Sequence, residues 1–328
     1  VAPDFTVEAF DNEDRKIDYI HRETAVEDIY FVSISSLEHQ EVTCRFRVSP
    51  DRVPSFWHAG DGRVTPCHVH ERGDGFVRVP LDLAPASSVF VVFRKGRAGE
   101  HLTRVEKQVA DGSFVPAGAG LQVLDVAPDR ATALVRDPGT YVLESAHGRT
   151  GLLVAPDTRR ETIEGPWLVW FQEDRGAPAE VTLGALADWT LHHEPGVRYF
   201  SGTAVYRNTF TLPEVPAMRD GVLLLDLGTV KEVASVRVNG REVGVLWKQP
   251  FQVDLAPFVR SGENQLEISV TNLWNNRIVG DLRMGLDKGI SRTNLRHKFT
   301  AKSPLLPSGL IGPVTLEAIT PTTIQLQP

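Results

Sequence analysis

The side chains best suited to recognise a sugar gather in one short stretch, residues 272–281. It holds a tryptophan, two adjacent asparagines, an arginine and an aspartate, directly after a strand-like run. An aromatic face stacks on the apolar C–H groups of a sugar ring, while planar amides and ions hydrogen-bond to its hydroxyls. In the alternative interpretation, the tryptophan belongs to the core and the polar residues pin a loop through backbone hydrogen bonds. Together with one earlier tryptophan, the candidate carbohydrate-binding residues are Trp247, Trp274, Asn275, Asn276, Arg277 and Asp281.

No set of residues identifies a catalytic centre. The nucleophile elbow, the phosphate-binding loop, the complete dinucleotide fingerprint and the zinc-protease motif do not occur in the sequence. Glycoside hydrolysis needs two carboxyl groups that flank the scissile bond. With 42 acidic residues in the chain, some pair is always available, so we nominate no catalytic residue.

Two stretches contain side chains that can bind metals. Cys67–His70 places His68 and His70 on one face of a strand, and two histidines can begin a metal site. No partner ligands are recognisable, so a solvated strand or loop is the preferred interpretation. Asp11–Asp14 offers oxygen atoms to calcium but does not fit the EF-hand pattern. We predict no metal site and no cofactor, and leave a structural calcium ion open.

Charge and length exclude several classes of partner. The 328 residues carry a formal net charge of −7, with lysine and arginine scattered along the chain. Nucleic acid and anionic membranes both attract basic surfaces, so we predict neither as a partner. No apolar run approaches the ~20 residues that a membrane-spanning helix needs. The chain opens at Val1 without a methionine or a visible signal peptide, which is typical of a processed or truncated piece. A disulfide between Cys44 and Cys67 is left open.

The pattern along the chain is that of an all-β protein. Short runs rich in Val, Leu, Phe, Ile and Thr recur between turns supplied by 27 glycines and 22 prolines. Examples are 28–34, 42–48, 88–93, 139–144 and 167–171. Polar, unpatterned segments near 94–103 and 155–164 predict domain boundaries. We therefore predict tandem antiparallel β-sandwiches, with a first domain over 1–104, a small β segment over 105–163 and a last domain over 164–328.

The last domain has the clearest pattern. The sequence from Val236 to Gly244 is a hairpin with Asn239-Gly240 at its turn, the strongest short hairpin signal. Further strands are expected at 202–212, 221–227 and 265–271. A helical turn is expected at Leu183–Trp189.

Several of these stretches resemble known glycoside hydrolases. Gly240–Phe251 with Val253-Asp254 resembles the sugar-binding domain of family 2 glycoside hydrolases, a galactose-binding-like jelly roll. A wider set of motifs is similar to the C-terminal, non-catalytic region of glycoside hydrolase family 106, the α-L-rhamnosidases. The motifs that carry this resemblance are Tyr19–Arg22, Asp28–Val32, Phe46–Val48, Phe56-Trp57, Ser88–Arg94, Phe200–Arg207, Leu225–Gly228, Val238–Gly240, Asn272–Arg277 with Gly280-Asp281, and Ser308–Val314.

The resemblance implies an accessory, carbohydrate-binding region of an enzyme that acts on rhamnose-containing polysaccharide. The family's catalytic barrel, with its acid/base pair and calcium, would precede Val1, so no catalytic residue is carried over to this chain. The implied partners are carbohydrate and the catalytic barrel of the same parent polypeptide. The implied location is secreted or periplasmic.

Two other functions compete with this one. The sandwiches could serve purely as a structural scaffold for the barrel, in which case the groove near Trp274 would be dry and filled. A carbohydrate-binding module instead requires Trp247 or Trp274 to be exposed. The chain could also be a complete small glycosidase, which requires two facing acids in a cleft.

Overall fold

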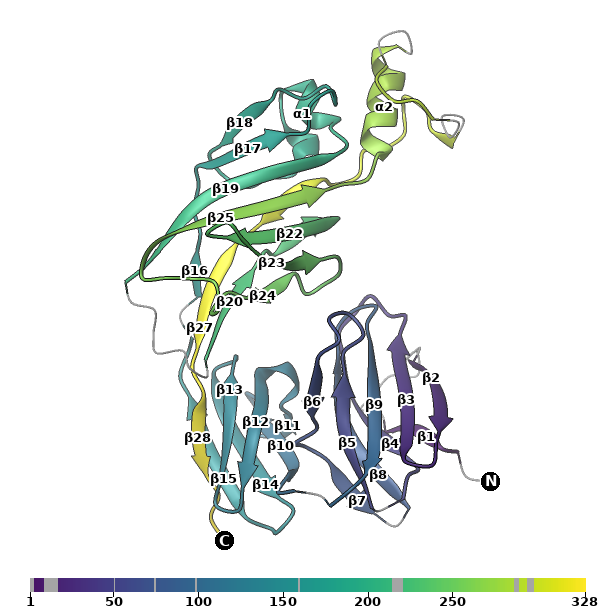
Figure 1. Ribbon diagram of the computed structural model, residues 1–328, viewed down its shortest axis with the longest axis vertical. Coiled ribbons are helices and arrows are strands. Elements are labelled where there is room, and N and C mark those ends of the chain that lie inside the picture. The colour runs from purple at the N-terminus through teal and green to yellow at the C-terminus, as the bar shows by residue number, and fades with distance from the viewer. Residues whose placement is uncertain are drawn as a thin grey trace. The chain divides into compact units, whose positions relative to one another are not determined.

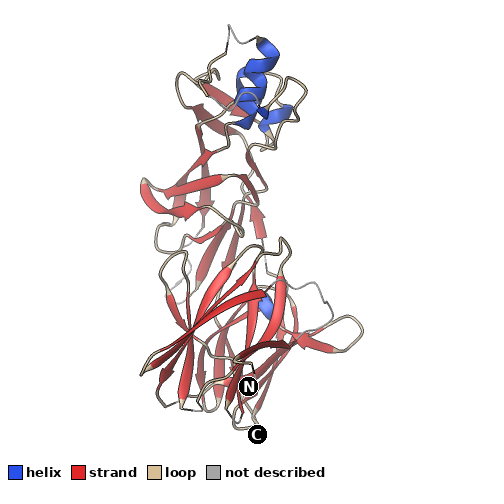
Figure 2. Ribbon diagram, turned by 90° about the vertical axis from the view of Figure 1, so that its right-hand side faces the viewer, coloured by secondary structure: helices blue, strands red, loops and turns tan. Residues whose placement is uncertain are grey.

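Strands make up nearly all the regular structure of the chain (Figures 1 and 2). The computed structural model describes residues 3–8, 17–49, 51–73, 75–97, 99–158, 160–213, 221–285, 289–293 and 298–328. The chain divides into two compact units, one formed by 1–158 with 319–328 and the other by 159–318. The predicted all-β class and its tandem antiparallel sandwiches are confirmed. Within the described part, no helix combines the length and apolar character needed to cross a membrane.

The first unit begins with a sandwich of two antiparallel sheets. One sheet has the strand order β1-β4-β8-β7 and the other the order β2-β3-β9-β5-β6. A core of buried aliphatic and aromatic side chains lies between them. The strands are β1 (Phe5–Glu8), β2 (Ile17–Glu23), β3 (Glu27–Ile34), β4 (Gln40–Phe46), β5 (Arg52–Trp57), β6 (Val64–Pro66), β7 (Glu71–Gly73), β8 (Phe76–Leu83) and β9 (Ser88–Lys95).

Alternation along β4 shows why these residues form a sandwich. Val42, Cys44 and Phe46 are buried, while the side chains between them are partly or fully exposed. Successive side chains of a strand point to opposite faces of the sheet, so this spacing buries one face and exposes the other to solvent. Both Cys44 and Cys67 are buried and free, and burial raises the pKa of each thiol to about 12. The disulfide that the sequence leaves open is therefore not formed in this structure.

A second, smaller sandwich completes the first unit. Its sheets have the orders β11-β10-β14-β15 and β12-β13-β28, around a separate hydrophobic core. The last strand pairs antiparallel with β13, so the C-terminal residues lie beside a segment from far earlier in the chain (Figure 1). The elements are β10 (Leu102–Gln108), β11 (Phe114–Pro116), the 3-10 turn η1 (Gly118–Gly120), β12 (Leu121–Ala127), β13 (Arg130–Val135), β14 (Gly139–Ser145), β15 (Thr150–Ala155) and β28 (Thr322–Gln325).

The second unit is built on a six-stranded antiparallel sheet. Its order is β18-β17-β19-β25-β22-β23, and a four-stranded sheet, β16-β27-β20-β24, contributes to the same core. A two-stranded sheet pairs β21 with β26. The strands are β16 (Arg160–Thr162), β17 (Trp167–Phe171), β18 (Glu180–Leu183), β19 (Thr203–Leu212), β20 (Val222–Asp226), β21 (Thr229–Lys231), β22 (Val233–Val238), β23 (Arg241–Leu246), β24 (Gln252–Asp254), β25 (Gly262–Thr271), β26 (Gly309–Gly312) and β27 (Thr315–Ile319).

The hairpin predicted at Asn239-Gly240 is present between β22 and β23. Both turn residues have positive φ, 51° and 76°, as a two-residue hairpin turn of this type requires. The helical turn expected at Leu183–Trp189 is wrong, because β18 extends to Leu183 and the first turn, η2, spans Trp189–Leu191. The Asp188 side chain accepts a hydrogen bond from Thr190 N at 2.9 Å and so starts η2 six residues later than predicted.

Two α-helices occur among the described residues of this unit, and the sequence pattern predicts neither. Helix α1 (Pro195–Arg198) is a single turn. Helix α2 (Asn275–Met284) follows β25 after three residues and carries most of the candidate carbohydrate-binding residues. Residues 276–281 of α2 are all buried, so this helix is held by neighbours on several sides rather than by one apolar stripe.

Candidate functional site

The link between β25 and α2 is fixed by Asn272. Its amide nitrogen donates to Phe200 O at 2.8 Å and to Ser308 Oγ at 2.5 Å, and its oxygen accepts from Gly202 N at 2.9 Å. The Ser201 hydroxyl donates to Leu273 O at 2.9 Å. The backbone that enters α2 is thus tied to the segments at 200–202 and at 308, which positions the residues that follow.

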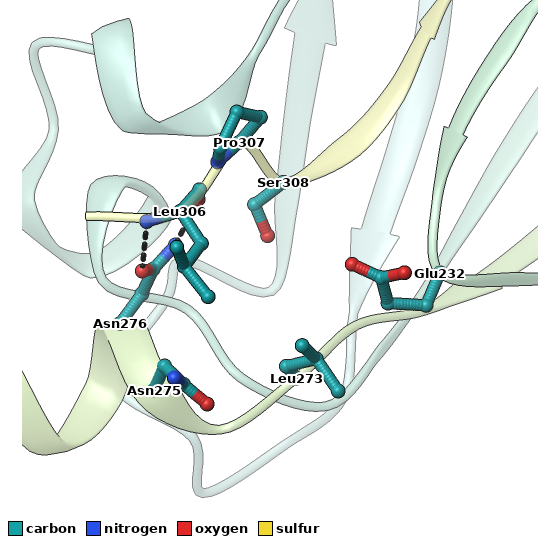
Figure 3. Close-up of a pocket in the computed structure, with 7 residues that line it drawn as sticks. All are labelled: Glu232, Leu273, Asn275, Asn276, Leu306, Pro307 and Ser308. Atoms are coloured by element: carbon teal, nitrogen blue, oxygen red, sulfur yellow. Dashed lines mark hydrogen bonds between the residues drawn. The ribbon is translucent and has the colours of Figure 1, made fainter. Parts of the chain in front are cut away.

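Asn276 ties α2 to the segment before β26. Its side-chain nitrogen donates to Leu306 O at 2.7 Å and its oxygen accepts from Leu306 N at 2.9 Å (Figure 3). The side chain is buried, and this two-way pairing with one backbone residue satisfies a buried donor and a buried acceptor at once. Both atoms of the Asn276 amide are therefore occupied by hydrogen bonds within the protein.

Arg277 and Asp281 form a buried ion pair along α2. Arg277 Nε and Nη2 each lie 2.8 Å from Asp281 Oδ1, and the two side chains are 7% and 1% exposed. The other carboxylate oxygen accepts from Ser291 N at 2.6 Å and from Ser291 Oγ at 2.5 Å. Burial alone would raise the pKa of Asp281. The hydrogen bonds from Ser291 and the Arg277 charge outweigh burial, so the pKa is lowered and the group stays ionised.

The two candidate tryptophans have exposed rings. Trp274 is 57% exposed at the start of α2, and Trp247 is 59% exposed in the loop after β23. The Lys248 ammonium lies 5.5 Å from the centre of the Trp247 ring. By contrast, Trp189 is 1% exposed in the core and stacks on Tyr206 with 6.2 Å between ring centres. Trp274 is therefore not a core residue, and both exposed rings can stack on a sugar face.

A shallow depression lies beside Trp274. Figure 3 shows Asn275 and Leu273 on one side of it, Pro307 and Ser308 on the other, and Glu232 at its edge. The depression is filled by its own side chains and leaves no space for a water-sized sphere. Any ligand at this place would have to lie on the surface above these side chains.

Five of the six candidate residues lie on 274–281, and Trp247 lies on a separate loop. Asn276, Arg277 and Asp281 are occupied by partners within the protein, whereas Trp247, Trp274 and the half-buried Asn275 present side-chain surface outward. The structure adds Asn272, Ser291 and Ser308 to the local network. Asn272 stands beside the candidate stretch in the sequence, but nothing in the sequence marks the two serines.

The histidines considered for a metal site lie in the first unit. His70 is 2% exposed, bonds Cys67 O through Nδ1 at 3.0 Å and stacks on His101 with 4.0 Å between ring centres. Burial, with the neighbouring His101 and Arg72 charges, lowers the pKa of His70 to about 3. Burial also lowers the pKa of His68. Asp11–Asp14 lies outside the described residues. In the described part, the one group with metal-ligand spacing is the exposed set His39, Glu41 and Asp82.

Two family models match the chain in separate regions. Residues 1–71 match the α-L-rhamnosidase family of glycoside hydrolases, and residues 163–296 match the sugar-binding domain of family 2 glycosyl hydrolases. These matches confirm the resemblance drawn from the sequence motifs. The second match covers most of the second unit, including β17 to β25 and α2.

Individual relatives agree with these matches. A protein of Formosa agariphila named "Putative beta-glucuronidase" is 35% identical over 205 residues, which is 56% of this chain and 18% of that protein. The solved structure of a rhamnosidase from Novosphingobium sp. PP1Y covers 97% of this chain at 34% identity, with a TM-score of 0.72. A β-glucuronidase from Ruminococcus gnavus covers 34% of the chain at 21% identity, but its TM-score of 0.30 supports no argument.

The chain spans a small part of these relatives. It covers 18% of the Formosa protein and 25% of the Novosphingobium rhamnosidase. It is thus related to a portion of glycoside hydrolases of the rhamnosidase type, and its second unit carries a sugar-binding-type domain.

Proposed function

We propose that this chain is an accessory, carbohydrate-binding region of an α-L-rhamnosidase-like glycoside hydrolase. The observation that carries the proposal is the exposure of Trp274 and Trp247 in a unit that matches a sugar-binding domain. Exposed aromatic rings are suited to stack on the apolar faces of sugars. Asn275 supplies an amide beside one ring, and Asn276, Arg277 and Asp281 hold the helix that presents it.

Within this proposal, hydrolysis belongs to a catalytic barrel elsewhere in the same parent polypeptide. Asp281 is buried and paired with Arg277, so it has neither the access nor the freedom that an acid/base group needs. The parent enzyme would act on rhamnose-containing polysaccharide outside the cell, in the medium or the periplasm. The second unit would be a galactose-binding-like jelly roll, and neither nucleic acid nor membrane would be a partner.

A second candidate function is that of a scaffold without sugar affinity. The depression beside Trp274 favours it, because it leaves no space in which a ligand could be held. Under this alternative, the exposed rings would pack against the parent enzyme rather than against a glycan.

The test is a titration of the chain with a rhamnose-containing oligosaccharide, followed by tryptophan fluorescence. We expect saturable binding that Trp274→Ala or Trp247→Ala weakens about tenfold, which corresponds to the loss of about 1.4 kcal/mol of stacking on one ring. Trp57→Phe, which changes a tryptophan of β5 in the first unit, serves as the control. If the wild type and both alanine variants bind equally well, neither tryptophan ring takes part in binding. Absence of binding by the wild type would favour the scaffold.

A further inference from the structure

The outward face of the six-stranded sheet carries a hollow of about 450 Å³, whose lining includes neither Trp247 nor Trp274. It lies over the four adjacent strands β19, β25, β22 and β23. Its lining is polar and charged, with Val233 as its one apolar side chain. The hollow is open to solvent, so a ligand in it would lie along the sheet surface rather than be enclosed.

The hollow arises from two small residues placed side by side. Ser235 of β22 and Ser269 of β25 are directly opposite each other in the antiparallel register. Side chains at such opposite positions are close neighbours on the same face, so two serines together leave a gap between the longer side chains around them. The adjoining residues Ala234 and Val270 point the other way, into the core, and fix the strands beneath the gap.

One wall of the hollow is formed by Glu267, Arg237 and Glu242, which continue a row of alternating charges that begins at Arg207 beside the hollow. Register places Arg207, Glu267, Arg237 and Glu242 next to one another across four strands. Arg207 Nε donates to Glu267 Oε2 at 2.8 Å, and its guanidinium lies 4.4 Å from the centre of the Trp170 ring. Arg237 and Glu242 are exposed, and neither has a hydrogen-bond or ion-pair partner among the described residues. This wall therefore offers an uncommitted donor and an uncommitted acceptor.

The opposite wall consists of hydroxyl groups. The side-chain oxygens of Thr203 and Thr271 lie 2.8 Å apart, and the serine hydroxyls form the floor between the two walls. A hydroxyl both donates and accepts hydrogen bonds, as does each hydroxyl of a sugar. Arg207, which lies beside the hollow, neutralises Glu267, and Arg237 and Glu242 carry opposite charges, so the hollow has no net preference for an anion or a cation. These features select a neutral ligand with many hydroxyl groups.

We propose that this hollow binds a neutral segment of a glycan chain. The sugar hydroxyls bond to Arg237 and Glu242 on one side and to the threonine hydroxyls on the other, with a ring over Ser235 and Ser269. This proposal rests on the proposed function, which states that the chain binds a polysaccharide. It assigns the contact to a surface separate from Trp247 and Trp274.

The first test fills the hollow. Ser269→Phe places a ring in the gap at a solvent-facing strand position, where an aromatic residue suits a β-strand. Thr209→Phe adds the same ring to the same sheet face outside the hollow and is the matched control. The probe is a neutral rhamnose-containing tetrasaccharide, and its affinity is measured by titration calorimetry. We expect the affinity of Ser269→Phe to be at least about tenfold lower than that of the wild type, and the affinity of Thr209→Phe to be unchanged.

The second test removes the charges of Arg237 and Glu242, which are unpaired among the described residues. It does not depend on whether Ser269→Phe folds. Arg237→Ala and Glu242→Ala should each weaken binding of the same probe by about tenfold or more, because hydrogen bonds to charged groups are the stronger ones. Gln265→Ala, at an exposed position two residues from Glu267 on the same strand face, should leave affinity unchanged.

The outcomes separate this inference from the proposed function. If Ser269→Phe, Arg237→Ala and Glu242→Ala all bind the glycan as tightly as the wild type, the hollow is not the binding site. The proposed carbohydrate-binding function would still stand. A wild type that binds no glycan would overturn both. Tighter binding of a tetrasaccharide that contains uronic acid than of the neutral probe would overturn the assignment to a neutral ligand.

Discussion

Two polar regions of the second unit contain similar side chains in opposite states. Around α2, the polar atoms of Asn276, Arg277 and Asp281 are buried and bonded to protein partners. In the hollow of the six-stranded sheet, Arg237 and Glu242 face solvent without such partners among the described residues. This contrast between paired and unpaired polar groups shows that residue type alone does not identify a binding site. A polar group is free to bind a ligand only where the chain has not already supplied its partner.

The largest expected effect is on the ion pair of α2. Asp281→Ala leaves the Arg277 charge buried without compensation, which should cost about 3–5 kcal/mol of the free energy of unfolding. Urea unfolding of the variant and the wild type measures the difference. A loss below about 1 kcal/mol, as is typical of a solvent-exposed ion pair, would contradict a structural role for this buried pair.

A smaller loss is expected at Asn276. Asn276→Ala removes a buried amide and both of its hydrogen bonds to the backbone of Leu306, at a cost of about 1–3 kcal/mol. Asn275→Ala, at the adjacent half-buried position, is the control and should change stability by less than about 0.5 kcal/mol. Equal losses at the two positions would show that burial near α2, rather than the bonds to Leu306, determines stability.

The pH dependence of the ion pair has a definite sign. The folded-state pKa of Asp281 is lowered, so the stability that its ionisation contributes is complete above the unfolded pKa and is lost as pH falls through the folded pKa. The stability difference between the wild type and Asp281→Asn should stay constant from pH 7 down to about pH 4 and shrink below it. A difference that grows on acidification would contradict the lowered pKa.

The smallest effect on stability is expected in the hollow. Arg237→Ala and Glu242→Ala remove exposed side chains without ion-pair partners in the described part of the chain, so each should change stability by less than about 0.5 kcal/mol. The same variants should lose glycan affinity. A large loss of stability in either variant would place the charged wall with the structural groups and remove the contrast with α2.

The strands could be predicted from the sequence because their signals are local. The run at Trp167–Phe171 forms β17 with the predicted bounds, and Asn239-Gly240 forms the predicted hairpin turn. Alternation and turn residues suffice for such elements. Helix α2 could not be predicted in this way, because its buried residues are six in a row and mix asparagine, arginine and aspartate with apolar residues, which gives no apolar stripe at helical spacing. Its stability comes from partners such as Leu306 and Ser291, which follow it in the chain.

The candidate site shows the same limit. The sequence stretch at 272–281 marks a place rich in polar and aromatic groups, but burial separates Trp274 from Asn276, Arg277 and Asp281. Composition did not distinguish the exposed Trp274 from the buried Trp189. The hollow was not predicted at all, since it depends on the register that brings Ser235 of β22 opposite Ser269 of β25. Register between distant strands is a tertiary property that local patterns do not specify.

The most direct test of the account is a proton NMR spectrum of a neutral rhamnose-containing tetrasaccharide in the presence of the purified chain. We predict that the sugar signals broaden or shift on addition of the chain and that no signal of free rhamnose appears over time. That result would establish binding without hydrolysis. Growth of a free-rhamnose signal would show that the chain itself is catalytic, and unchanged sugar signals would show that it does not bind this glycan; either result would contradict the account.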